Sequence, residues 1–247
     1  MQHQDMQVEL LRHVGDDLAV VNAARVSFDK ESDWVKEYLE YSAQYGWGEE
    51  YVDRVCVDQS LGEPDKKLIK YLAKHNHFTP FTHCFATFRI TCPIAVARQL
   101  HKHQVGLSVN EVSRRYVSTE PTFYVPPVWR GKAENKKQGS AGVVEPYDYG
   151  MMDDKDLTPF EWAYQHCLEA YLNLLDAGVC EEQARLVLPV GSNTTFIWSG
   201  SLAAWTRVIN LRTSDDAQPE TRIVADQIAS HISSHFPVSY EALCDVR

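Results

Sequence analysis

A short segment near the middle of the chain concentrates the side chains that could bind an anion. Between positions 93 and 117 there are four basic residues and one carboxylate, namely Arg98, Lys102, Arg114, Arg115 and Glu111. Guanidinium groups present paired N–H donors that match the oxygens of a phosphate. An apolar core would leave so many polar groups without hydrogen-bond partners, so these side chains are not expected to be core residues. The segment therefore indicates a phosphate site, although a solvated basic helix face is the commoner explanation for clustered Arg and Lys.

The composition of the whole chain limits what this segment could bind. The 247 residues include 24 basic and 34 acidic side chains, a net charge of -10 that argues against a surface for duplex nucleic acid. The first residues lack the apolar run of a signal peptide, and no stretch approaches the roughly 20 apolar residues of a membrane span. The six cysteines are scattered without a CxxC pair, which is typical of free thiols in a reducing compartment. We expect a cytoplasmic protein with no membrane or DNA partner.

A strand and a helix must position the basic segment. Residues 83–92 alternate apolar and polar side chains, which predicts a strand with one buried face. Pro93 then ends the strand and begins a predicted helix that runs to about Gln104. This helix would place Arg98 and Lys102 on a shared face.

The rest of the chain predicts both strands and helices. Strands are predicted at 6–14 and 194–200, and helices at 16–26, 31–44, 64–75, 158–177, 181–187, 201–211 and 217–235. Asp16 is expected to cap the first of these helices. Residues 130–155 are polar with few periodic apolar positions, so we expect a surface loop or insertion. No repeat or long linker divides the chain, and residues 1–247 are predicted to form a single α+β domain.

Two neighbouring strings resemble the signature of a known enzyme family. RQLHKHQ at 98–104 is followed by SVNEVSRRY at 108–116, and together they resemble the motif of flavin-dependent thymidylate synthases. Further strings similar to this family occur in the right order: AARVSF (23–28), HFTPFTH (77–83), FYVPP (123–127), QARLVLP (183–189) and LR followed by AQPETR (211–222). Any one of them could arise by chance, but the ordered set spans almost the whole chain. The chain is therefore identified as a member of this family.

The resemblance implies a fold, an assembly and a reaction. The implied fold is an α+β subunit with a mixed sheet flanked by helices, assembled as a homotetramer whose active sites form between subunits. The implied reaction is the reductive methylation of dUMP to dTMP by a methyltransferase. Methylenetetrahydrofolate would supply the carbon, FAD would carry the hydride and NADPH would be the reductant. No cysteine lies in the motif to attack the pyrimidine, so the flavin would carry the difficult chemistry.

The resemblance also assigns residues to the nucleotide. The expected substrate-binding residues are Gln99, Lys102, Glu111, Ser113, Arg114, Arg115, Arg185 and Arg212, with the four from Glu111 to Arg115 coming from a neighbouring subunit. Arg212 is the expected catalytic residue, because a cation beside the pyrimidine stabilises negative charge that develops in the transition state. From position alone, Arg212 could also be a cationic helix cap, and Arg185 could pair with Glu181 or Glu182. Ser113 is assigned to binding, because no adjacent base would activate its hydroxyl.

The flavin is expected to contact a partly separate set of residues. These are Ser27, His77, Thr79, Lys102, His103, Gln104, Glu111, Ser201, Arg207 and Leu211. No GxGxxG string or P-loop spacing offers another nucleotide cradle. Each of the pairs His75/His77 and His101/His103 could suggest a metal site. Residues two apart on a helix do not face each other, so no metal is expected at the second pair, and we expect none at the first.

Several positions depart from the family pattern. The family's Arg-His-Arg is Lys-His-Gln at 102–104, and the gap to the following serine is one residue longer. The family's Asn-x-Arg is Ser-Leu-Ala at 201–203, its next asparagine is Arg207, and a frequent histidine is Asp216. Arg207 could replace part of the lost positive charge. These changes affect the expected flavin contacts more than the expected reaction.

Two other functions fit the same basic segment. One is a nucleotide-binding flavin oxidase that transfers no carbon because of the changes at Lys102 and Gln104. The other is a non-catalytic nucleotide- or RNA-binding protein whose aromatic side chains stack on bases. The aromatic residues near the segment are Tyr116, Phe123, Tyr124 and Trp129. The net charge argues against the second function, and such aromatic residues are more often part of a core.

Overall fold

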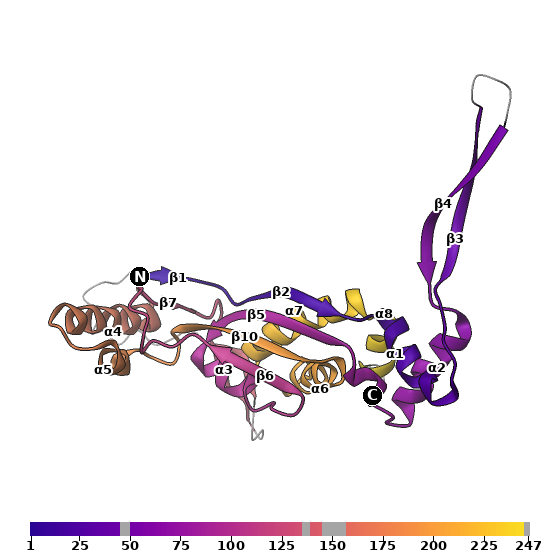
Figure 1. Cartoon of the computed structure of the whole chain (residues 1–247). Helices are drawn as coiled ribbons and strands as arrows, with labels where there is room; N and C mark the ends of the chain where they lie inside the picture. Colours follow the sequence, from indigo (N-terminus) through magenta and orange to yellow (C-terminus); the bar gives the residue numbers. More distant parts are fainter. Residues whose placement is uncertain (45–49, 135–138, 145–156, 245–247) are drawn as a thin grey trace.

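A four-stranded antiparallel sheet forms the centre of the molecule (Figure 1). The computed structural model describes residues 1–44, 50–134, 139–144 and 157–244. The sheet has the order β2 (Gln7–Val14), β5 (Phe85–Pro93), β10 (Asn193–Ser201) and β6 (Leu107–Glu111), and each neighbouring pair is antiparallel. Parallel pairing is found between β1 (Gln2–His3) and β7 (Thr122–Phe123). The prediction of a mixed sheet is wrong for the described residues, because the four-stranded sheet is antiparallel throughout and the parallel pair forms a separate sheet.

The two central strands of this sheet have one apolar and one polar face, as the alternation at 83–92 predicts. On the apolar face, the cross-strand pair Phe88 and Trp198 is buried. On the other face, the hydroxyls of Thr87 and Ser199 are 3.0 Å apart and hydrogen bonded. Burial of the aromatic face against helices provides the main stabilisation of the sheet.

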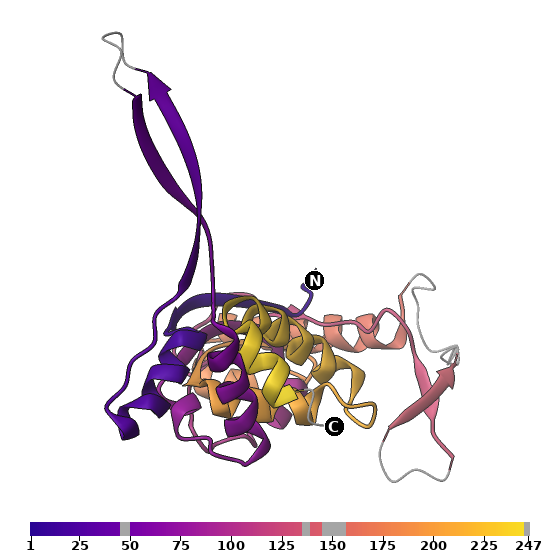
Figure 2. The ribbon, with the colours of Figure 1, turned by 90° about the vertical axis from the view of Figure 1, so that its right-hand side faces the viewer.

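Helices cover the apolar face and enclose the core. They are α1 (Asp17–Arg25), α2 (Glu63–Lys74), α3 (Ile94–Leu100), α6 (Leu202–Arg212), α7 (Pro219–His235) and α8 (Pro237–Cys244). Helix α7 contacts β2 and β5, and α6 contacts β10, so these C-terminal helices pack against the sheet (Figures 1 and 2). Trp205 is buried and donates its indole N–H to the Ala86 carbonyl at 3.1 Å. The Asp16 side chain accepts the Ala19 N–H at 2.8 Å, which confirms the predicted cap of α1.

A second, smaller apolar cluster lies at the end of the molecule near the N-terminus. It is built mainly by α4 (Pro159–Asp176) and α5 (Glu181–Ala184), and α4 also contacts the 3-10 turn η3 (Arg185–Val187). Tyr164 stacks on Phe123 of β7, with ring centroids 4.9 Å apart. Thr158 and Glu161 form a capping box at the start of α4, so this helix begins where the sequence predicts. This cluster fixes the position of η3 and hence of Arg185.

The helix predicted at 31–44 is wrong. Residues of β3 (Val35–Gln44) and β4 (Glu50–Ser60) instead form an antiparallel hairpin, which we call the arm. The arm projects far from the rest of the molecule (Figure 1). Val35 and Leu39 are spaced like the apolar positions of a helix, but they also alternate with polar residues at the period of a strand. Pairing with β4, a segment that the sequence analysis leaves unassigned, favours the strand.

Further differences concern the end of α3, the segment 130–155 and the C-terminus. The helix predicted to reach Gln104 ends at Leu100, and the chain then turns into β6, which the sequence analysis misses. The segment 130–155 is not loop throughout, because β8 (Arg130–Lys132) and β9 (Ser140–Val143) form a short hairpin. Positions 135–138 and 145–155 of this predicted loop lie outside the described residues. The C-terminal helix α8 is also missed, whereas α1, α2, α4, α6 and α7 agree with their predicted ranges to within a few residues.

Helices in the described ranges are too short or too polar for a membrane span.

Candidate active site

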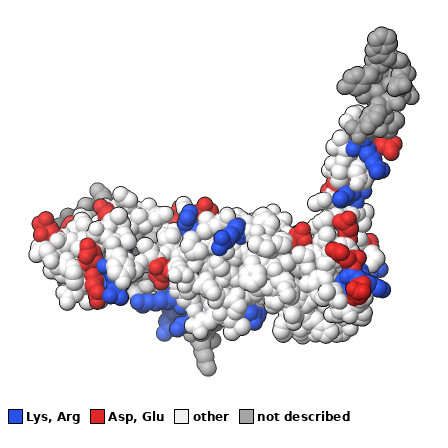
Figure 3. All heavy atoms as spheres, viewed as in Figure 1, with Lys and Arg blue, Asp and Glu red and all other residues white. Residues whose placement is uncertain are grey.

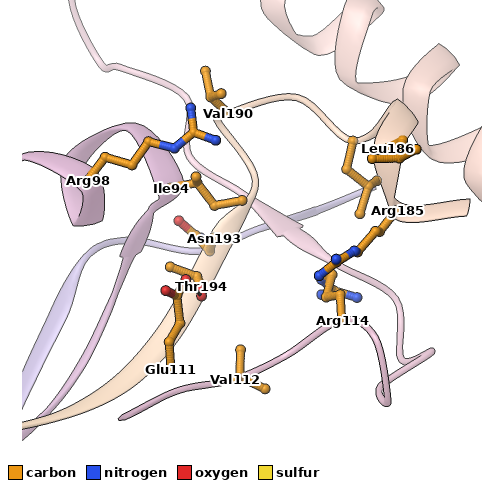
Figure 4. A pocket seen from close by; sticks show the side chains of 11 residues that line it. Ile94, Arg98, Glu111, Val112, Arg114, Arg185, Leu186, Val190, Asn193 and Thr194 are labelled. Carbon is orange, nitrogen blue, oxygen red and sulfur yellow. Dashed lines mark hydrogen bonds between the residues drawn. The ribbon is translucent and has the colours of Figure 1, made fainter. Parts of the chain in front are cut away.

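One cavity collects basic residues from both halves of the sequence (Figure 4). It has a volume of about 300 Å³. Its polar lining consists of Arg98, Glu111, Arg114, Arg185, Asn193 and Thr194. We call it the arginine pocket. The side chains of Arg114 and Arg185 point into it although they are far apart in the sequence (Figure 4). Closely placed guanidinium groups suit a phosphate dianion.

Hydrogen bonds hold the polar walls of the arginine pocket. Glu111, at the end of β6, accepts the Thr194 hydroxyl at 2.7 Å. Arg114 donates to the Thr119 carbonyl at 2.7 Å. His101 Nδ1 lies 3.9 Å from Glu111 Oε2, while burial lowers the pKa of His101 and Glu111 acts in the opposite direction. The neutral form of His101 is therefore favoured.

Arg115 and Ser113, which belong to the same motif, do not line this pocket. Arg115 Nε donates to a Glu182 carboxylate oxygen at 3.3 Å, in an ion pair that is about half exposed. The Ser113 hydroxyl accepts the Arg115 backbone N–H at 3.3 Å, which is a local turn contact. Arg185 donates to the backbone carbonyl of Glu182 at 3.2 Å and leaves the carboxylate of that residue to Arg115. The ion pair considered for Arg185 from the sequence is thus made by a different arginine.

A second cavity lies beside the end of α6 and has a volume of about 590 Å³. Its lining consists of Gln99, Arg130, Gly139, Ser140, Arg212, Asp216, Ala217, Gln218 and Pro219. We call it the Arg212 pocket. Arg212 is the last residue of α6, and its Nε donates to His103 Nε2 at 2.9 Å. Its Nη2 donates to the backbone carbonyl of Gln99 at 3.2 Å. One edge of the guanidinium group is therefore fixed, which leaves Nη1 outside these two contacts.

His103 can hold Arg212 only while its ring is neutral. A protonated imidazole has no acceptor nitrogen, whereas a neutral ring with hydrogen on Nδ1 accepts at Nε2. Burial lowers the pKa of His103, and the positive charges of Arg212 and Arg207 lower it further. The surroundings of His103 thus favour the form that accepts from Arg212.

The loop between α3 and β6 packs on α6. Arg207 Nη2 donates to the Val105 carbonyl at 2.8 Å. Gly106 has a φ of +76°, and a Cβ at this position would lie 3.1 Å from the Ala204 side chain, so glycine is required there. Ser201 is buried and its hydroxyl accepts the Ala204 N–H at 3.3 Å as the cap of α6. Lys102 and Gln104 are exposed on this loop.

The residues around this loop fit a flavin dinucleotide. Lys102 and Arg207 are cations that could face a pyrophosphate, and the replacement of lost charge by Arg207 stays a prediction. Val105 and Leu211 are apolar side chains with exposed fractions of 74% and 56%. Leu211 lies one helical turn beyond Arg207, so an apolar surface adjoins the cationic groups. This donor set could hold the phosphates and cover the ring of a flavin.

The other residues expected at the flavin lie on a different part of the chain. Ser27 is in the 3-10 turn η1 (Val26–Phe28), and His77 and Thr79 precede the 3-10 turn η2 (Pro80–Thr82). All three are exposed, and η2 packs against α1 and α6. Neither pocket includes these three residues in its described lining.

Five of the eight expected substrate residues are thus divided between two pockets of one chain, whereas Lys102, Ser113 and Arg115 line neither pocket. The arginine pocket brings together Glu111, Arg114 and Arg185, and the Arg212 pocket brings together Gln99 and Arg212. Lys and Arg side chains gather along the lower edge of the body near α3, although the chain as a whole is acidic (Figure 3). Residues that the sequence analysis does not propose also line the pockets, chiefly Thr194, Arg130 and Gln218. Gln218 lies in the string AQPETR, so its position in a family-like string could have indicated a site residue. No feature of the sequence indicates Arg130.

Comparison with known proteins agrees with the resemblance. The family model described as thymidylate synthase complementing protein matches residues 9–238. A flavin-dependent thymidylate synthase of Thermosipho africanus is 34% identical over 95% of this chain and 89% of its own length. A flavin-dependent thymidylate synthase of Thermus thermophilus is 33% identical over 95% of this chain and 74% of its own length.

A solved structure shows that the similarity extends to the fold. The UMP/dUMP methylase PolB from Streptomyces cacaoi, bound with 5-Br dUMP, has a TM-score of 0.74 and 28% sequence identity. The alignment covers 99% of this chain and 97% of that chain. The family model and these relatives show that the chain belongs to the family of flavin-dependent thymidylate synthases, the thymidylate synthase complementing proteins.

Proposed function

We propose that this protein methylates dUMP to dTMP, with methylenetetrahydrofolate as carbon donor, FAD as hydride carrier and NADPH as reductant. The observation that carries the proposal is the placement of Arg212 on the wall of a nucleotide-sized cavity, with one edge fixed by His103 and Gln99. The names of the curated relatives and the nucleotide analogue bound to the structural neighbour support the same reaction.

The side chains of this chain have separate tasks in the proposed reaction. Arg114 and Arg185 would bind the phosphate, because their fixed forks match its oxygens. Arg212 would lie against the pyrimidine and stabilise the negative charge that develops when the ring is activated at C5. Its guanidinium group is already oriented, so little reorganisation is needed during the reaction. Bound FAD would supply the hydride that completes the methyl group.

We also propose that the protein is a homotetramer with active sites shared between subunits. The division of the nucleotide residues between two pockets supports this, because one phosphate and one pyrimidine must be bound together. Residues 1–247 would form one domain of each subunit. None of the six cysteines, each of which is described, forms a disulfide, and this suits the expected cytoplasmic location.

A second substrate is favoured by a specific observation. The structural neighbour is named a UMP/dUMP methylase and has also been solved with 5-Br UMP. UMP differs from dUMP only by its 2′-hydroxyl, so the same phosphate and pyrimidine contacts could be made. Both nucleotides should therefore be offered in any assay of this protein.

The test is product formation by purified protein supplied with FAD, NADPH and methylenetetrahydrofolate. We expect a visible flavin spectrum and conversion of dUMP to dTMP, with activity reduced on the order of a hundredfold or more in Arg212→Ala. A colourless protein that stays inactive with added FAD would contradict the proposal. A salt-sensitive RNA complex in the same preparation would instead support the RNA-binding alternative.

A further inference from the structure

We propose that the β8–β9 hairpin is part of the nucleotide pocket and that Arg130 is a positioning residue for Gln99. This inference rests on the proposed function, because it takes the Arg212 pocket as the site of the pyrimidine. The hairpin contributes three residues to that pocket, Arg130, Gly139 and Ser140. They line the same cavity as Gln99 and Arg212, so the hairpin contributes to its wall.

An ion pair between Arg130 and Glu220 connects the hairpin to α7. Arg130 Nη2 donates to the two carboxylate oxygens of Glu220 at 2.6 and 2.7 Å. Its Nε donates to the Ser140 hydroxyl at 2.8 Å, which joins the two strands of the hairpin. Glu220 is only 6% exposed, so the buried negative charge of its carboxylate needs the positive charge of Arg130 to stabilise it. The carboxylate can only accept hydrogen bonds, and this fixes the direction of the contacts that follow.

The ion pair sets the orientation of two side-chain amides. Gln218 Nε2 donates to Glu220 at 2.8 Å, which turns the Gln218 carbonyl oxygen toward Gln99. The Gln99 amide nitrogen donates to that oxygen. The side-chain oxygen of Gln99, Oε1, then accepts a hydrogen bond from the Thr221 hydroxyl at 3.1 Å. Each amide in this series of hydrogen bonds thus has one favourable orientation. The series begins at Arg130.

Oriented amides suit the recognition of a uracil ring. An amide group has two N–H donors and two acceptor lone pairs, so Gln99 and Gln218 each retain hydrogen-bonding capacity beyond these contacts. Uracil and cytosine exchange a donor and an acceptor along one ring edge, and a fixed amide distinguishes them where a rotating one does not. Gln99 also holds Arg212 through its backbone carbonyl, so the amides and the catalytic guanidinium share one support.

The test measures nucleotide binding to the flavin-loaded protein by calorimetry. The variants are Arg130→Ala and, as a matched control on the same hairpin, Lys132→Ala, whose side chain is exposed and lines neither pocket. We expect Arg130→Ala to raise the Kd for dUMP by about tenfold and to reduce the preference for dUMP over dCMP, with Lys132→Ala unchanged. Glu220→Gln, a neutral substitution of the same size, should reproduce both effects and decides the matter if Arg130→Ala fails to fold.

The possible failures are distinguishable. Wild-type protein that does not bind dUMP would overturn the proposed function together with this inference. Wild-type protein that binds dUMP, with equal affinity and equal preference in folded Arg130→Ala or Glu220→Gln, would overturn the inference alone. A parallel loss of dUMP and dCMP binding without a change of preference would also contradict it, because a merely structural defect has that effect.

Discussion

The contact between His103 and Arg212 makes the position of the catalytic cation depend on protonation. The pKa of His103 is lowered by burial and by the charges of Arg212 and Arg207, so its neutral form persists somewhat below the usual pKa of histidine. As the pH falls through the lowered pKa, the ring gains a proton and can no longer accept from Arg212. We expect kcat for dTMP formation to fall on the acid side below pH ~6.5.

His103→Gln tests this explanation of the acid limb. Glutamine retains an acceptor oxygen but does not titrate in this range. We expect the variant to keep much of the wild-type activity at neutral pH and to lose the part of the acid limb that His103 causes. A profile of kcat against pH that is the same in wild type and variant would assign the acid limb to another group. His101→Gln, at the neighbouring histidine that faces Glu111, is the matched control.

Glu220 should make the stability of the protein pH dependent. Burial raises the pKa of Glu220, but hydrogen bonds from Arg130 and Gln218 outweigh that effect and lower it below the usual value of 4.5. A carboxyl whose folded-state pKa is lowered stabilises the fold above its unfolded pKa, and this stabilisation is lost as the pH falls through the lowered value. We expect the urea midpoint of wild type to fall more steeply than that of Glu220→Gln in acid. Parallel curves for the two proteins would show that Glu220 is not responsible.

Residues of the arginine pocket could be anticipated better than those of the Arg212 pocket wall. Glu111, Arg114 and Arg185 belong to strings that resemble the family motif, and the structure brings them together. Arg130 could not be anticipated, because it lies in a polar segment without periodic apolar residues. Its role depends on a hairpin and on Glu220, which is 90 positions away in the sequence. Such a contact comes from the tertiary structure and has no local signal.

At the scale of elements, the arm exposes large apolar side chains to solvent in the part of the chain that the structure describes. Leu39 and Val55 are cross-strand partners and therefore share a face, with exposed fractions of 60% and 51%. Lys36 and Gln59 are partners on the opposite face. An isolated two-stranded hairpin is marginally stable in water, and exposed apolar surface of this kind is typical of an interface. We expect the arm to pack against another subunit of the proposed tetramer.

The change Leu39→Lys tests the packing of the arm. It places a charge on the apolar face, so we expect a lower assembled mass by light scattering. Gln59→Glu is the control, because it adds a charge on the polar face opposite Lys36. Equal masses for wild type, Leu39→Lys and Gln59→Glu would show that the arm does not take part in assembly.

The arm also shows why the sequence predicts some elements and not others. Helices α1, α4 and α7 carry their own caps or starting prolines, so their limits can be read locally. The strand β5 has the alternation of a sheet with one buried face. By contrast, β3 carries apolar residues that suit either period, and only its pairing with β4 decides the outcome. The same holds for β6, a short exposed strand that is defined by pairing with β10.

At the scale of the whole molecule, shared active sites predict that two inactive variants can restore each other. Arg212→Ala damages the Arg212 pocket and Arg185→Ala damages the arginine pocket. If each site combines these pockets from different subunits, tetramers formed after joint unfolding and refolding will contain some intact sites. We expect measurable dTMP formation from this mixture. A mixture of Arg212→Ala and Gln99→Ala is the control, because both changes affect the same pocket.

A failure of this mixture would contradict the shared site. Activity no greater than in the control mixture would mean that each chain completes its own site. Activity of both single variants near the wild-type level would instead remove these residues from the reaction. The experiment thus separates the arrangement of subunits from the identity of the catalytic groups.

The most direct test of the central claim is a single turnover without oxygen. The FAD-loaded protein is reduced chemically and mixed with dUMP and methylenetetrahydrofolate, and flavin oxidation and dTMP are measured together. We predict one dTMP formed for each flavin oxidised, which links the methyl transfer to the flavin and removes any need for NADPH in this step. Flavin that stays reduced while dUMP is recovered unchanged would contradict the claim that this chain is a thymidylate synthase.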